Sequence, residues 1–90
     1  MVTAILTHEV KNYSDWKKGF DEGEPMRQQA GIKTKGVYSS VDNANHVTII
    51  AEFPSAEVVQ GFLSNPDLKA AMEKAGVIGK PEMKILNYMN

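Results

Sequence analysis

The order in which strand and helix signals follow one another most strongly limits the folds open to this chain of 90 residues. Apolar and polar residues alternate with the two-residue period of a strand over residues 2–10, 32–41, 46–53 and 82–89. One helical region follows the first strand and another follows the third, which gives the order βαββαβ. This order predicts an α+β fold in which a four-stranded antiparallel sheet carries both helical regions on one face.

Both helical regions are predicted to be broken once along their length. In the first, a serine is the expected N-cap, and a glycine and a proline interrupt the apolar stripe before a second glycine ends the helix. In the second, an asparagine followed by a proline restarts the helix. Residues 77–81 are then expected to form a loop. The expected caps and breaks are Ser14, Gly23, Pro25, Gly31, Ser55, Asn65, Pro66 and Gly76.

The two faces of the predicted sheet differ in polarity. Two right-handed crossovers place the first and third strands in the centre, and the more apolar face of the third strand should meet the helices. The opposite face is mixed, but Ile5, Ile50 and either Ile85 or Leu86 would form an apolar stripe in water. We therefore expect a homodimer that packs sheet against sheet. The residues expected to face the helices are Val47, Ile49, Ala51 and Phe53, with Ala4, Leu6 and His8.

Size and composition predict a single domain, residues 1–90, that gains burial by pairing with itself. Ten basic and eleven acidic residues without a block of like charge argue against a nucleic-acid partner. No apolar run is long enough to span a membrane, and no leader pattern is present, so a cytoplasmic location is expected. The sequence has no cysteine, and its two histidines have no spacing typical of metal ligands, so neither a metal nor a cofactor is expected.

Four segments and one residue cluster resemble a known superfamily. The segments are HEVKNYSDWKKGFD, RQQAGI, DNANHVTIIAEF and SNPDLKAAMEKAGV, and the cluster is His8, Tyr13, Trp16, Phe20 and Asp21. Together they resemble small members of the dimeric α/β barrel superfamily, the ferredoxin-like group that includes antibiotic biosynthesis monooxygenase-type proteins. The resemblance implies a ferredoxin-like fold that dimerises into an α/β barrel, with a ligand pocket between the helices and the sheet.

Members of this group with known roles include cofactor-independent monooxygenases of quinols or polyketides and haem-degrading enzymes. The haem-degrading pattern has an asparagine on the first strand, a tryptophan beyond the third and a histidine on the second helix. Here the single tryptophan, Trp16, lies on the first predicted helix, and neither His8 nor His46 lies on the second. Haem chemistry is therefore not expected.

The candidate site residues are His8, Trp16, Phe20 and Tyr38. His8 could be a base or hydrogen-bond donor in a small pocket, or a structural histidine that ties strand to helix. Trp16 and Phe20, four residues apart, could hold a flat ligand or simply fill the core. Tyr38 is a further candidate ligand contact.

Two functions remain open at the level of the sequence. The first is a homodimeric module that binds a small aromatic or polyketide-like ligand between helices and sheet. The alternative is a cofactor-independent monooxygenase or cyclase in which His8 acts as base or hydrogen-bond donor. A pocket that touches His8 and Trp16 would favour ligand chemistry, whereas a His8 ring with all its partners in a dry core would exclude it.

Overall fold

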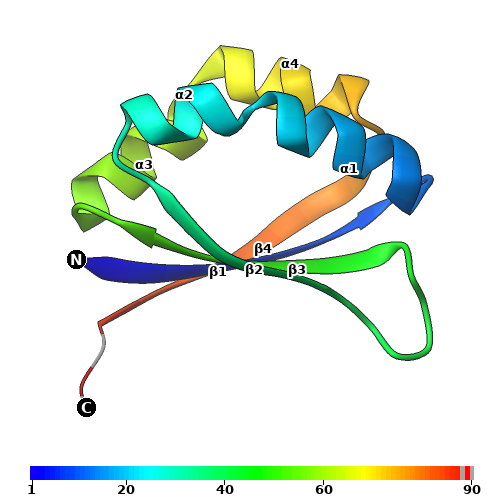
Figure 1. The fold of residues 1–90 in the computed structure, drawn as a ribbon, viewed down its shortest axis with the longest axis horizontal. Helices are drawn as coiled ribbons and strands as arrows, with labels where there is room; N and C mark the ends of the chain where they lie inside the picture. Colours follow the sequence, from blue (N-terminus) through cyan, green and yellow to red (C-terminus); the bar gives the residue numbers. More distant parts are fainter. Residues whose placement is uncertain (88, 90) are drawn as a thin grey trace.

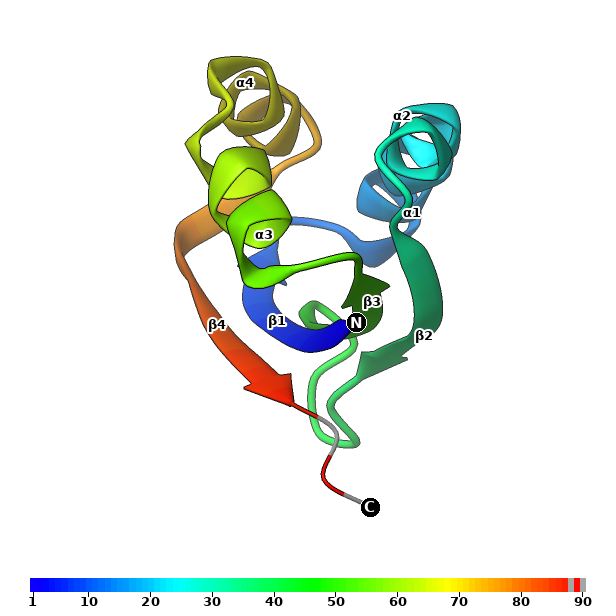
Figure 2. The ribbon, with the colours of Figure 1, turned by 90° about the vertical axis from the view of Figure 1, so that its left-hand side faces the viewer.

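The computed structural model describes residues 1–87 and 89 and shows all the described helices on one side of an antiparallel sheet and none on the other (Figure 1). The helices form two arms, α1 with α2 and α3 with α4, which we call the first and second helical arm (Figure 2). The elements are β1 (Val2–Val10), α1 (Tyr13–Glu22), α2 (Glu24–Gln29), β2 (Lys33–Ser39), β3 (His46–Phe53), α3 (Ala56–Ser64), α4 (Pro66–Lys74) and β4 (Val77–Asn87).

The sheet has the order β2-β3-β1-β4, so the predicted central position of the first and third strands is confirmed. All three strand pairs are antiparallel. Side chains of β3 alternate between buried and half-buried along the whole strand, with Val47, Ile49, Ala51 and Phe53 towards the helices. The strand register places Ala4 directly opposite Ala51 at the centre of the sheet. The sequence parity therefore identified the helix-facing side correctly.

The predicted breaks in both helical regions are confirmed. Gly23 separates α1 from α2, and the backbone of Gly31 has the left-handed φ of 77° expected of a residue that ends a helical region. In the second arm, Ser55 accepts a hydrogen bond from the amide of Val58, and Asn65 accepts one from the amide of Asp67. Each cap satisfies an amide that the first turn of a helix leaves free.

Several predicted boundaries are wrong. Asn12, not Ser14, caps α1 by accepting the amide of Asp15 at 3.1 Å, because the helix begins at Tyr13. β2 is shorter than the predicted strand 32–41. Residues 77–81, predicted as a loop, belong to β4. This strand stays in the sheet and shifts its register with β1 between the pairs Thr7–Glu82 and Glu9–Ile78. Of the predicted strand end, residue 88 lies outside the described residues and residue 89 is not in a strand.

The sheet face that points away from the helices, which we call the open face, is only partly polar. Thr7 and Thr48 share a hydrogen bond at 3.2 Å across β1 and β3, and Ile5 lies opposite Ile50 on the same strands. Leu86, 43% exposed, lies on this face, because its neighbour Ile85 is opposite Ala4 and packs into the core. In the described part of the chain, no helix is long and apolar enough to cross a membrane.

Candidate functional site

A cavity of about 130 Å³ lies between the helix-facing side of the sheet and the two helical arms. The buried core is divided into two clusters, one around Phe53 and Val59 and one around Trp16 and Val47, and residues of both clusters line the cavity. An engineered apolar cavity of roughly 150 Å³ in another protein binds benzene. The cavity in this chain therefore has the size for a ligand built on one aromatic ring.

Small side chains make room for the cavity. Ala4 and Ala51, paired across β1 and β3, line its floor and are 2% and 7% exposed. Above them the two arms approach one another where a Cβ added to Gly19 would lie 3.3 Å from the Cβ of Ala75. Met26, on the first arm, lines the cavity and is 41% exposed, so this side chain touches both the cavity and solvent.

One wall of the cavity is a row of stacked side chains on the first helical arm, which we call the aromatic row: Trp16, Phe20 and Arg27. The rings of Trp16 and Phe20 are stacked with centroids 5.0 Å apart, and the guanidinium carbon of Arg27 lies 3.8 Å from the centroid of Phe20. Stacking and cation–π contacts stabilise this arrangement of the side chains beyond the effect of the buried apolar area. The row therefore keeps the large rings along one side of the space.

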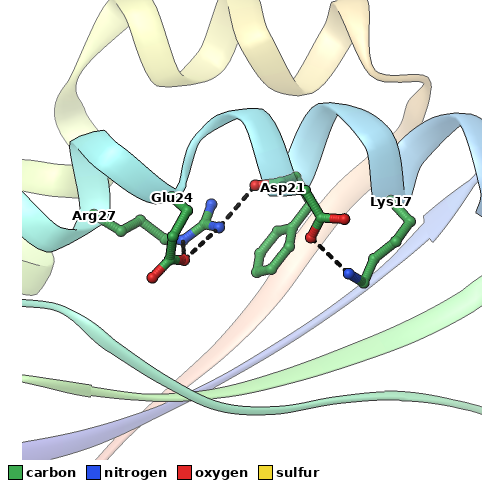
Figure 3. A network of polar contacts seen from close by, with 5 residues as sticks. Lys17, Asp21, Glu24 and Arg27 are labelled. Carbon is green, nitrogen blue, oxygen red and sulfur yellow. Dashed lines mark hydrogen bonds and ion pairs between the residues drawn. The ribbon is translucent and has the colours of Figure 1, made fainter.

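Arg27 is almost fully buried, at 8% exposed, and is held by two partners. Its Nε and Nη2 donate to one carboxylate oxygen of Glu24 at 3.2 and 2.9 Å, and Nη2 also donates to the backbone carbonyl of Phe20 at 2.7 Å (Figure 3). The same carbonyl, in the last turn of α1, also accepts the amide of Gly23 at 3.1 Å. Arg27 thus ties α2 to α1 across the break at Gly23 and fixes the ring of Phe20.

Asp21, part of the cluster that suggested the superfamily, lies outside the cavity. Its carboxylate accepts from Lys17 Nζ at 2.6 Å on the outer side of α1, and its side chain is 61% exposed (Figure 3). A pair so exposed contributes little to stability.

His8 lies on β1 in the cavity wall and is 5% exposed. Its ring meets the ring of Trp16 edge to face, with centroids 5.5 Å apart. Burial lowers the pKa of His8; a contact with its own backbone opposes this effect, and the charge of His46 adds to it. The ring atom Nδ1 is buried without a hydrogen-bond partner among the described residues. The lowered pKa favours the neutral form of the imidazole near neutral pH.

Thr34 is a site residue that the sequence analysis missed. It lies on β2 opposite Ala51, lines the cavity, and its Oγ1 is buried without a partner among the described residues. The alternation of residues that begins at Ile32 could have placed Thr34 on the helix-facing side. A threonine in a weakly predicted strand, however, does not by itself indicate a binding site. Arg27 was also missed: its spacing of seven residues from Phe20 fits the same helix face, but an arginine is ordinarily exposed.

The structure does not bring Tyr38 to the other predicted site residues. Tyr38 lies opposite Thr48, on the open face, and is 57% exposed. Its ring covers Gly36, where an added Cβ would lie 2.5 Å from Tyr38 Cε1. The ring of Tyr38 thus occupies the space that a side chain at position 36 would fill. The prediction that Tyr38 contacts the ligand in the cavity is wrong, because Tyr38 lies on the other side of the sheet.

His46 contributes to a second hollow, of about 320 Å³, over the irregularity between β1 and β4. Glu9, Glu82 and Lys80 share its lining. Among residues 1–87 and 89, no group of three or more histidine or carboxylate side chains is arranged to hold a metal ion.

Comparison with known proteins identifies the fold. No family model and no curated protein matches the sequence, but solved structures match the whole fold. A protein from Bordetella bronchiseptica assigned as an antibiotic biosynthesis monooxygenase has a TM-score of 0.77 at 14% identity, over 99% of this chain and 97% of its own. SnoaB, a cofactor-independent oxygenase from Streptomyces nogalater, has a TM-score of 0.74 at 14% identity, over 99% and 93%.

An uncharacterized NIPSNAP domain protein from Burkholderia xenovorans is similar as well, with a TM-score of 0.70 at 15% identity, over 98% of this chain and 94% of its own. The chain therefore has the ferredoxin-like fold of antibiotic biosynthesis monooxygenase-type proteins, as the resemblance in sequence implied. At 14–15% sequence identity these similarities establish the fold and not the function.

The neutral His8 predicts a specific loss of stability in mild acid. Because its pKa in the folded protein is below the usual 6.5, the unfolded chain binds the proton first, and the free energy of unfolding should fall as pH falls from 6.5 towards the lowered value. Urea unfolding at closely spaced pH values measures this fall. In His8→Phe this part of the pH dependence should disappear, whereas His46→Gln should keep most of it, since His46 is the smallest cause. An unchanged pH dependence in His8→Phe would contradict the assignment.

Proposed function

We propose that the chain binds a small aromatic ligand in the cavity between the helices and the sheet, with His8 as its polar contact. The observation that carries the proposal is an almost wholly apolar cavity into which a few polar groups converge, two of them without a partner. Protein interiors are normally filled, and buried polar atoms are normally paired. A cavity that departs from both rules at one place is typical of a ligand site.

The aromatic row suits a flat ligand. The rings of Trp16 and Phe20 line the cavity, and a ring placed beside them would gain stacking or edge contacts in addition to burial. His8 meets the edge or face of Trp16 and would lie beside such a ligand. A neutral imidazole can accept a hydrogen bond from a phenol or an enol, or donate one to a carbonyl.

A second candidate function is a cofactor-independent oxygenase or cyclase, and the position of His8 in the cavity wall, with Nδ1 unpartnered among the described residues, favours it. A neutral, desolvated imidazole can take the proton of an enol or phenol, which leaves the ligand as its anion and His8 as imidazolium. The resulting electron-rich anion is the species that an oxygenase or a cyclase needs. Consumption of oxygen or of the ligand itself, abolished in His8→Phe, would favour the enzyme; binding without turnover favours the binding protein.

We also propose that two copies of the chain associate through the open face. The support is the row of half-buried and exposed apolar side chains on it, from Ile5 and Ile50 to Leu86, together with the large exposed ring of Tyr38. Removing such a surface from water contributes about 25 cal/mol per Å². Tyr38 would then serve the interface and not the ligand site.

Filling the cavity should remove binding without unfolding the protein. Ala51→Ile adds a side chain into the empty space, so the affinity for 4-methylphenol should fall at least tenfold, measured by calorimetric titration. Overpacking a filled core costs about 1–3 kcal/mol, whereas here the unfolding free energy should change by less than about 1 kcal/mol. Ala70→Leu, at an exposed position on α4, is the matched control. Undiminished affinity in Ala51→Ile would refute binding in this cavity.

A charge on the open face should separate the two copies. Light scattering coupled to size-exclusion chromatography should give twice the mass of the chain for the wild type and the mass of one chain for Ile50→Lys. Burying an unpaired lysine in a sheet-to-sheet interface costs several kcal/mol. Ala70→Lys, on the helical side, should remain a dimer. A wild-type protein that runs as one copy at micromolar concentration would overturn the proposed association.

A further inference from the structure

We infer that the cavity has a second polar end at Thr34, and that it selects a ligand with one aromatic ring and a short arm ending in an uncharged oxygen. In this arrangement the ring carries a hydroxyl or carbonyl that pairs with His8, and the oxygen at the end of the arm pairs with Thr34 Oγ1. The inference rests on the proposed function, since it concerns which ligand the same cavity takes.

The hydroxyl of Thr34 is the observation that requires explanation. Oγ1 is buried, lines the cavity and has no hydrogen-bond partner among the described residues. A buried hydroxyl without a partner destabilises the protein that contains it, and valine would fill the same volume without that loss. A hydroxyl offers one donor and two acceptor positions, so a ligand oxygen of either kind can satisfy it.

The register of the sheet places the two unpartnered atoms at opposite ends of the cavity. His8 on β1 lies opposite Val47, and Thr34 on β2 lies opposite Ala51, four residues further along β3. Four residues along a strand and two strand spacings across correspond to roughly 16 Å between the two Cα atoms. A single ring cannot reach both ends, so the ligand must extend beyond its ring.

The lining between the two ends sets the chemistry of the middle of the ligand. Ile49 and Ala51 form the floor there, and the rings of Trp16 and Phe20 form the wall on the first helical arm. Of these four side chains only Trp16 carries a hydrogen-bonding group, its indole N–H, and its ring lies beside His8 at one end of the cavity. The ring and the carbons of the arm should therefore be apolar, with polar atoms only at the two ends.

The state of Arg27 argues for an uncharged oxygen at the end of the arm. Arg27 is the one lysine or arginine among the described residues that line the cavity, and a carboxylate on the ligand would need it as a counter-charge. Its Nε and Nη2 are already bonded to Glu24 and to the carbonyl of Phe20. Because Glu24 balances the charge, burying a further carboxylate nearby would be unfavourable.

Two probes that differ by one hydroxyl test the inference. They are 3-(4-hydroxyphenyl)propan-1-ol and 4-propylphenol, which share the ring and the three-carbon arm. Both should bind the wild type, and the ratio of their dissociation constants should shift about tenfold towards 4-propylphenol in Thr34→Val, as expected for the loss of one buried hydrogen bond. Thr3→Val, on the open face, is the matched control and should leave the ratio unchanged.

A stability measurement separates a ligand contact from a structural one. Thr34→Val without ligand should be at least as stable as the wild type in urea unfolding, because no hydrogen bond within the protein is lost; a clear loss of stability would overturn the inference. If both probes bind the wild type and Thr34→Val leaves their ratio unchanged, the second polar end is wrong while the proposed function stands. If neither probe binds the wild type, the proposed function fails together with the inference.

Discussion

The contact of Arg27 with Phe20 is the interaction on which the rest of the site depends. The guanidinium group stacks on the ring and is held by Glu24 and by a carbonyl of the last turn of α1. This arrangement joins the two halves of the first helical arm across their break and aligns Phe20 with Trp16. Because the large rings are kept to one wall, the paired alanines at the centre of the sheet stay uncovered, and a cavity remains where a small domain would ordinarily have its core.

The polar atoms around the cavity make sense in terms of a ligand and not of folding. A chain of this size has little core from which to recover the loss of stability caused by unpaired groups. His8 Nδ1 and Thr34 Oγ1 are both left without partners in the described structure, and both line the same space. Groups that reduce stability in the empty protein gain their partners when a ligand binds, so the ligand recovers that loss as affinity.

Much of the fold could be predicted from the sequence because periodicity and caps act locally. The alternation over residues 46–53 predicted β3 to the residue, and parity then placed His8 on the helix-facing side of β1. The site was harder to predict, because it depends on register between strands and on helix breaks. Thr34 becomes a site residue only through its position opposite Ala51, and Tyr38 leaves the site because its register opposite Thr48 turns it to the open face. The pair of Glu24 and Arg27, three residues apart, is a local pattern, but nothing in the sequence indicates that this arginine is buried.

The central claim is that an open apolar space exists between the paired alanines of the sheet and the aromatic row. Diffraction from crystals of the protein pressurised with xenon tests it most directly, because xenon enters apolar cavities of this size without needing a specific chemical partner. A xenon peak should appear between Ala51 and the ring of Phe20, with the side chains around it unmoved. Absence of xenon there, with Phe20 or Phe62 turned into the space, would contradict the claim.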